Sequence, residues 1–332
     1  MRNTILMLSA ALLLMGCSEP SNENTDTASA PDDKLVTTTR GDHIDTYFGV
    51  EIPDPYRWLE NDLSNDTADW IADQNASTRS YIDAISLRDD VKNTVARLLN
   101  FERETAPFIE GGKRYFYRNS GLQNQRVLYR IEEDGSEDVF LDPNTFSEDG
   151  TVSMSSVSFS EDGSLVAYQL SEGGSDWRSI VIRDVATGDV LESPLVDVKF
   201  SGINWLGNEG FFYSSYDKPD GSELSAKTDQ HKLYFHALGT PQSSDEVIFG
   251  ATAEQKHRYV GASVGGDDRY LVISAANSTS GNKLFIKDLA SESDDLIVVF
   301  ADESADASLL ESNDDYLLIE TNRDAPKGRV IA

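Results

Sequence analysis

The chain has 332 residues, of which 39% are hydrophobic, and this composition is typical of a globular protein with one large domain or two smaller ones. The formal net charge is −30, because 58 acidic residues face only 28 basic ones. This balance excludes nucleic acid as an expected partner, since phosphate binding requires clustered Lys and Arg. We interpret the acidity as a solvated surface, with a specific cationic partner as the alternative.

Residues 1–17 have the features of a bacterial lipoprotein signal peptide. A basic residue precedes an apolar run over residues 5–15, which is too short to span a bilayer as a helix. The run ends with a glycine before Cys17, the single cysteine, and this order resembles the site where cleavage exposes a cysteine for acylation. We expect Cys17 to anchor the protein in the bacterial cell envelope on the periplasmic side. Because Ser18 follows, the outer membrane is favoured over the inner; an ordinary secretory signal is the alternative.

Residues 18–42 predict a flexible tether, and residues 43–104 predict a short helical segment. The tether begins with a polar stretch that lacks aromatic residues. In the helical segment, Asp66 is the candidate cap of the first helix. The second helix has an apolar stripe from Leu87 to Leu98 at helical spacing. Each helix therefore has one apolar face that needs a partner surface.

Strand patterns replace the helical ones at about residue 105. The stretch Val157–Asp184 predicts three strands with an Asp-Gly hairpin turn at Gly163. A further turn leads toward an expected strand at residues 190–191. A meander of about four strands in ~40–50 residues is one blade of a β-propeller. Residues 105–332 therefore predict a mainly β fold, an incomplete propeller of four to five blades. Other expected strands cover residues 113–117, 126–130, 138–141, 210–214, 232–237, 246–249, 270–274, 283–288, 296–300 and 316–320.

One motif resembles the nucleophile elbow of hydrolases. Residues 261–265 match G-x-S-x-G around Ser263, but the elbow requires a helix after the serine, and here a turn and another strand follow. The hydrolase order also places the histidine after the serine, whereas all four histidines precede it: His43, His231, His236 and His257. We therefore predict a hairpin at this position and no catalytic residue.

The sequence also predicts no metal and no cofactor. His231 and His236 are five positions apart, so a strand would point them to opposite faces. No H-E-x-x-H or C-x-x-C pattern and no nucleotide-type Gly-rich loop is present in the sequence. We expect both histidines to be ordinary surface or core residues.

Several longer runs, in order along residues 43–332, resemble the prolyl oligopeptidase family. The matching runs are Ile52–Glu60, Gly111–Tyr117, Gly121–Tyr129, Phe140–Gly150, Ser158–Gly163, Gly174–Trp177, Val198–Trp205 and Lys232–Thr240. The resemblance implies a seven-bladed propeller that caps an α/β-hydrolase domain, with a Ser-Asp-His triad that hydrolyses short peptides after proline. It further implies that the propeller gates access and that residues 43–104 pack on the hydrolase domain.

The resemblance also implies partners and one site residue. Proline-containing oligopeptides are the expected substrates of the intact enzyme, and a separate hydrolase-domain chain is a candidate partner. The 332 residues alone are expected to be an inactive fragment. A non-catalytic lipoprotein whose propeller binds peptides or proteins is the alternative.

In the family, a phenylalanine of the Val-Lys-Phe-Ser run reaches the active-site interface, and this residue corresponds to Phe200. The alternative for Phe200 is a core aromatic beside Trp205. The family also has a substrate-contacting arginine after the strand that matches Tyr270–Ser274. This chain has Ala276 and Asn277 there, so no substrate contact is assigned to that segment.

Overall fold

The computed structural model describes residues 36–332 except 220–221, 225–227, 267, 294 and 313–315. The expected signal peptide, the expected lipidation site Cys17 and most of the expected tether lie outside these residues. No helix in the described part of the chain is both long enough and apolar enough to cross a membrane.

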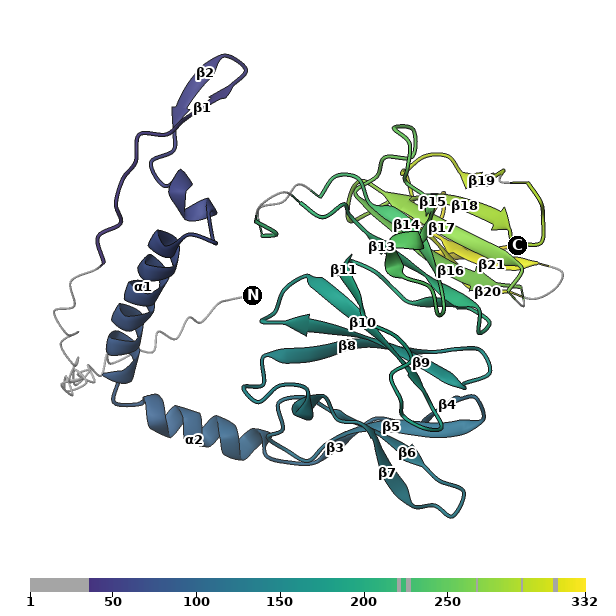
Figure 1. Cartoon of the computed structure of the whole chain (residues 1–332), viewed down its shortest axis with the longest axis horizontal. Helices are drawn as coiled ribbons and strands as arrows, with labels where there is room; N and C mark the ends of the chain where they lie inside the picture. The colour runs from purple at the N-terminus through teal and green to yellow at the C-terminus, as the bar shows by residue number, and fades with distance from the viewer. Residues whose placement is uncertain (1–35, 220–221, 225–227, 267, 294, 313–315) are drawn as a thin grey trace, which may run out of the picture.

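The helical segment stands apart from the propeller (Figure 1). Strands β1 (Ile44–Tyr47) and β2 (Val50–Pro53) form a hairpin, followed by a short 3₁₀ turn and by helices α1 (Asn65–Asp83) and α2 (Arg88–Leu99). Ser64 caps α1, because its backbone is extended and its Oγ accepts the N–H of Thr67 at 3.2 Å. The expectation that Asp66 is the cap is therefore wrong: Asp66 lies in the first turn.

Five sheets follow in the described residues, and this number agrees with the expected four to five blades. In blade 1, β3 (Arg103–Glu104) and β4 (Phe108–Glu110) both pair with the same strand and share the inner position, and the blade continues outward through β5 (Lys113–Asn119), β6 (Val127–Ile131) and β7 (Glu137–Leu141). Blade 2 contains β8 (Val152–Phe159), β9 (Leu165–Glu172), β10 (Trp177–Asp184) and β11 (Leu195–Lys199).

The remaining blades repeat the same antiparallel order. Blade 3 contains β12 (Asn204–Leu206), β13 (Gly210–Ser215), β14 (Lys232–Ala237) and β15 (Glu246–Phe249). Blade 4 contains β16 (Tyr259–Gly265), β17 (Tyr270–Ala276), β18 (Lys283–Asp288) and β19 (Ile297–Phe300). Blade 5 has three strands in the described residues: β20 (Ala307–Ser312), β21 (Leu317–Thr321) and β22 (Arg329–Ile331).

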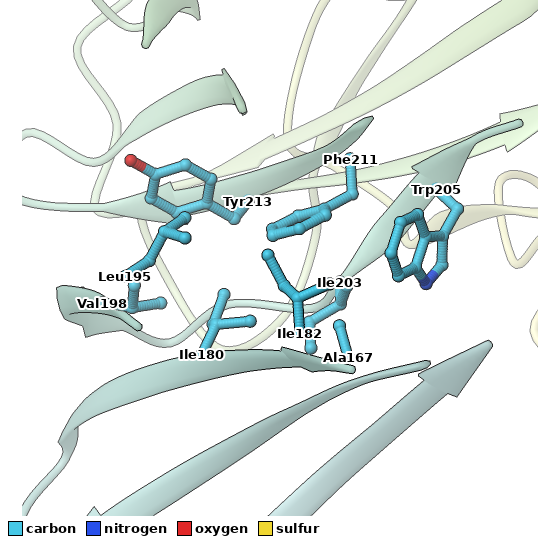
Figure 2. Close-up of a cluster of buried hydrophobic side chains, with 9 residues drawn as sticks. All are labelled: Ala167, Ile180, Ile182, Leu195, Val198, Ile203, Trp205, Phe211 and Tyr213. Atoms are coloured by element: carbon cyan, nitrogen blue, oxygen red, sulfur yellow. The ribbon is translucent and has the colours of Figure 1, made fainter. Parts of the chain in front are cut away.

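The core lies between neighbouring blades, so a middle strand is buried on both faces. In β13 every residue is buried: Phe211 packs with residues of blade 2, while Phe212 packs with residues of blade 4. Figure 2 shows the first of these clusters, in which Phe211 and Trp205 lie over the aliphatic side chains of blade 2. Burial on two faces explains why the sequences of these strands are continuous apolar runs, without alternation of apolar and polar residues.

The outer strand of blade 2 lies later in the chain than expected. Residues 190–191 form only an isolated bridge, from Arg183 to Val190, and the strand itself is β11. The reason is burial: Leu195 and Val198 are almost fully buried against blade 3, whereas Val190 is half exposed.

Antiparallel order gives the propeller two rims. The chain enters blade 1 from α2, and every crossover to a new blade and every turn from a second to a third strand lies on that same side. We call this side the helix-side rim. Its described residues are 100–103, 120–126, 142–151, 173–176, 200–203, 216–219, 222–224, 228–231, 250–258, 277–282, 301–306 and 322–328, with the residues at the adjoining strand ends.

Candidate functional site at the helix-side rim

Phe200 lies at the helix-side rim, directly after β11. Its ring is 45% exposed and lies next to two tyrosines, with centroid distances of 6.3 Å to Tyr216 and 6.1 Å to Tyr259. Trp205 is instead buried in the cluster between blades 2 and 3. The structure thus places Phe200 outside the core. Its contact with substrate stays a prediction.

Tyr216 is the buried neighbour of Phe200. Its ring stacks on His231 at 4.3 Å, and its hydroxyl donates to the backbone carbonyl of Arg258. Burial, together with the neighbouring Tyr259, raises the pKa of Tyr216 to about 12, so the hydroxyl keeps its proton and remains a donor. This hydrogen bond joins blade 3 to the crossover that leads into blade 4.

His231 fixes the same region through both ring nitrogens. The N–H of Val260 donates to Nδ1 at 2.8 Å, so Nε2 carries the proton and donates to the carbonyl of Lys199 at 2.9 Å. Burial lowers the pKa of His231 to about 4, which keeps the ring neutral. His231 therefore joins blades 2 and 4 through blade 3, and it lies fully buried in the propeller.

Lys199 lies beneath Phe200 and is only 8% exposed. Its Nζ lies 4.9 Å from the ring centroid of Trp177 and 5.3 Å from that of Phe200, so both contacts are cation–π interactions. Within the described residues the ammonium has no carboxylate partner and no hydrogen-bond acceptor. The nearest acid in sequence, Asp197, pairs with Lys218 at 2.9 Å.

Asn277 has a structural role at the position where the family arginine was expected. Its backbone N–H and its Nδ2 donate to the carboxylate of Glu303 at 3.0 and 2.8 Å, and its Oδ1 accepts the N–H of Arg258 at 3.3 Å. Ala276 ends β17. These bonds tie a turn of blade 4 to the crossovers on either side of it, which is a packing function.

His236 lies at the opposite rim, away from His231. It is buried, with Nδ1 2.8 Å from Asp245 and Nε2 2.9 Å from Glu192. Both nitrogens face carboxylates, so both donate and the ring is an imidazolium. Burial alone would lower the pKa of His236, but the hydrogen bonds to the two carboxylates outweigh it and raise the pKa. The two histidines share no site. Among the described residues no group of three or more His, Cys, Asp or Glu is arranged to hold a metal ion.

Ser263 lies within a strand. It belongs to β16 and pairs with Val272 of β17, so the hairpin expected around this motif is confirmed. An elbow would require a helix after the serine.

The comparisons with known proteins agree with this architecture. Residues 36–332 match the family described as "Prolyl oligopeptidase, N-terminal beta-propeller domain". The chain belongs to the prolyl oligopeptidase family. This confirms the resemblance seen in the sequence, and it identifies the chain with the N-terminal propeller portion of that family.

Curated relatives and solved structures give the extent of the match. The chain is 48% identical to the "Prolyl endopeptidase" of Elizabethkingia meningoseptica over 325 residues, which are 98% of this chain and 45% of the relative. It is 32% identical to "Prolyl oligopeptidase A" of Amanita bisporigera, over 88% of this chain and 43% of that relative. The structure of prolyl oligopeptidase B from Galerina marginata bound to a 25mer macrocyclization substrate superposes with a TM-score of 0.75 at 28% identity, over 90% of this chain and 46% of that one. The chain thus spans somewhat less than half the length of these relatives.

The sequence alone did not identify the neighbours of Phe200. Tyr216 and Tyr259 adjoin strands of different blades, and Lys199 lies in a matched run without a chemical role assigned to it. Their position could have indicated the site, because each of these residues lies next to a turn or crossover on the same rim.

Proposed function

We propose that this chain forms the propeller and helical segment of a post-proline serine peptidase, and that the helix-side rim faces the hydrolase domain. The observation that carries the proposal is the position of Phe200, half exposed at this rim on a support of buried aromatic residues. The prolyl endopeptidase relatives and the substrate-bound Galerina structure support peptides as the ligand class. The propeller then gates access for short proline-containing oligopeptides.

The exposed apolar surface of the helical segment supports a hydrolase partner surface. Val91, Val95 and Leu98 lie on one face of α2, and all are about half exposed. A hydrolase domain, in the same polypeptide or in a second chain, would cover this face of α2. Further blades would pack against blades 1 and 5 and complete the propeller. The Ser-Asp-His triad belongs to that domain in this proposal.

The alternative, a non-catalytic lipoprotein that binds peptides, is less favoured. It would leave the helix faces exposed to water, and the relatives that match almost the whole chain are peptidases.

We propose that Cys17 carries a lipid and holds the protein in the cell envelope, with residues 18–42 as the tether. The apolar run before the single cysteine and the polar composition after it support this arrangement. Cys17→Ser should then release the protein from the membrane fraction into the soluble periplasmic fraction. An unchanged distribution would contradict the anchor.

Recovery of the protein from its source cells tests the enzymatic proposal. An antibody raised against residues 18–60 would capture the protein, and the captured material would be assayed with a short fluorogenic peptide containing one proline. We expect cleavage after proline, with slower cleavage of a long unfolded polypeptide that the propeller excludes. Captured protein without post-proline cleavage would contradict the proposal and favour the non-catalytic alternative.

A further inference from the structure

Lys199 is a largely buried residue whose ammonium has only aromatic partners among the described residues. It is 8% exposed, and its Nζ lies within cation–π distance of the rings of Trp177 and Phe200. The ammonium has three N–H donors, and Nζ is not among the fully buried side-chain atoms that lack a hydrogen-bond partner in the described residues, so it reaches the surface. Since no described carboxylate or hydroxyl accepts from Nζ, the donors are free for a ligand.

The support around Lys199 is rigid. Trp177 is buried, and its indole N–H donates to the carbonyl of Glu223 at 3.2 Å. The backbone carbonyl of Lys199 accepts from the ring of His231 at 2.9 Å. These hydrogen bonds therefore hold the ring of Trp177 and the main chain of Lys199 in place before any ligand binds, as a binding site requires.

The backbone next to Lys199 is strained. Asp197 and Phe200 have φ values of +56° and +53°, which are costly for residues other than glycine. Such conformations cluster at ligand-binding sites, where the surrounding structure holds them in place. The half-exposed ring of Phe200 lies beside the ammonium, 5.3 Å from Nζ to the ring centroid.

We propose that Lys199 determines specificity by binding a carboxylate of the peptide, while the exposed ring of Phe200 contacts the adjacent apolar part. This inference rests on the proposed function, since it assumes that peptides reach the helix-side rim. The carboxylate comes from an acidic side chain or from the C-terminus of a short peptide. The chemistry of recognition, an ammonium on a carboxylate, is the same for both.

The net negative charge of the protein opposes the binding of a carboxylate. At −30, the overall field repels an anionic peptide and weakens its binding relative to a neutral one. The proposal predicts the opposite sign, because a cation in direct contact with the bound carboxylate outweighs the distant charges. A gain in affinity on adding a carboxylate therefore points to a specific site.

The test is calorimetric titration of the 332-residue chain with three N-acetylated hexapeptides that each contain one proline. One has a terminal amide, one has a free terminal carboxylate, and one keeps the amide but has Glu in place of Gln. We expect at least one carboxylate peptide to bind about tenfold more tightly than the neutral one, the gain of one charge-assisted hydrogen bond. Lys199→Met should abolish this gain, and Lys199→Arg should keep part of it.

The matched control is Lys256→Met. Lys256 lies on the same rim but is exposed and pairs with Asp229 at 2.9 Å, so its loss changes the net charge equally without touching the site. Equal carboxylate gains in the wild type and in Lys199→Met, or no gain at all, would overturn the role of Lys199 while leaving peptide binding intact. If no peptide binds, the neutral one included, then both this inference and the proposed peptide site are overturned. Thermal melting of each variant confirms that it is folded.

Discussion

The propeller and the helical segment differ in how far their apolar side chains are exposed to solvent. In the propeller, Leu271 is fully buried in the cluster between blades 3 and 4. In α2, Leu98 is 60% exposed. Both segments have apolar residues in a pattern that predicts burial, and within the described part of the chain only the blades have the neighbour that buries them. The pattern therefore predicts which face is apolar, while the presence of a partner has to be seen in the structure.

The largest expected effect tests this difference with one chemical change at two positions. Leu271→Ala removes buried methyl groups and leaves a cavity, so it should lower the free energy of unfolding by about 2–5 kcal/mol. Leu98→Ala removes an exposed side chain of the same type and should change it by no more than about 0.5 kcal/mol. Urea denaturation of the 332-residue chain measures both. Equal losses would show that α2 is packed in solution.

The two buried histidines should give opposite pH dependence. The folded pKa of His236 lies above its usual value of 6.5, so its contribution is complete below pH 6.5 and is lost as the pH rises through the folded pKa. The folded pKa of His231 is about 4, so its contribution is complete above pH 6.5 and is lost as the pH falls toward 4. Each pKa unit corresponds to about 1.4 kcal/mol.

Substitution separates these two contributions. In urea titrations at a series of pH values, His236→Gln should flatten the loss of stability on the alkaline side, and His231→Gln should flatten the loss on the acidic side. Each variant serves as the control of the other. The same pH profile in both variants would contradict the assigned protonation states.

A smaller effect concerns the contact between the hairpins of blades 1 and 2. A Cβ on Gly163, which has φ +68°, would lie 2.4 Å from the Cα of Gly111. Gly163→Ala should therefore lower stability by about 2–3 kcal/mol, from backbone strain and the clash together. Gly135→Ala is the matched control, since Gly135 has φ +84° with nothing within 4 Å and should lose only about 1–2 kcal/mol. Equal losses in unfolding experiments would show that the two hairpins are not in contact.

The middle and outer strands were largely predictable from the sequence. Strands β14, β15 and β18 have the expected bounds, because runs rich in apolar residues are bracketed by Gly, Asp or Pro turns. Among the inner strands, β12 and β20 were not expected. They are short or largely exposed, so their apolar signal is weak.

The site was only partly predictable. Spacing alone favoured a core position for Phe200, and the family resemblance was what singled it out. Its environment depends on contacts between blades: Tyr216, Tyr259 and Lys199 come from three different blades, and no local pattern brings them together. The buried ion pairs of His236 depend on the same kind of contact, since Glu192 lies 44 positions away.

The most direct test of the central claim is kcat/KM for cleavage of a short proline-containing peptide by the protein captured from its source cells, as wild type and as Phe200→Ala. We predict post-proline cleavage by the wild type and a loss of about tenfold in the variant, the effect of about 1.4 kcal/mol of lost contact. Val190→Ala, a half-exposed position of the same blade near the opposite rim, should leave kcat/KM unchanged. Equal values for Phe200→Ala and the wild type would contradict the substrate-facing role of this rim, and the absence of any cleavage would contradict the peptidase itself.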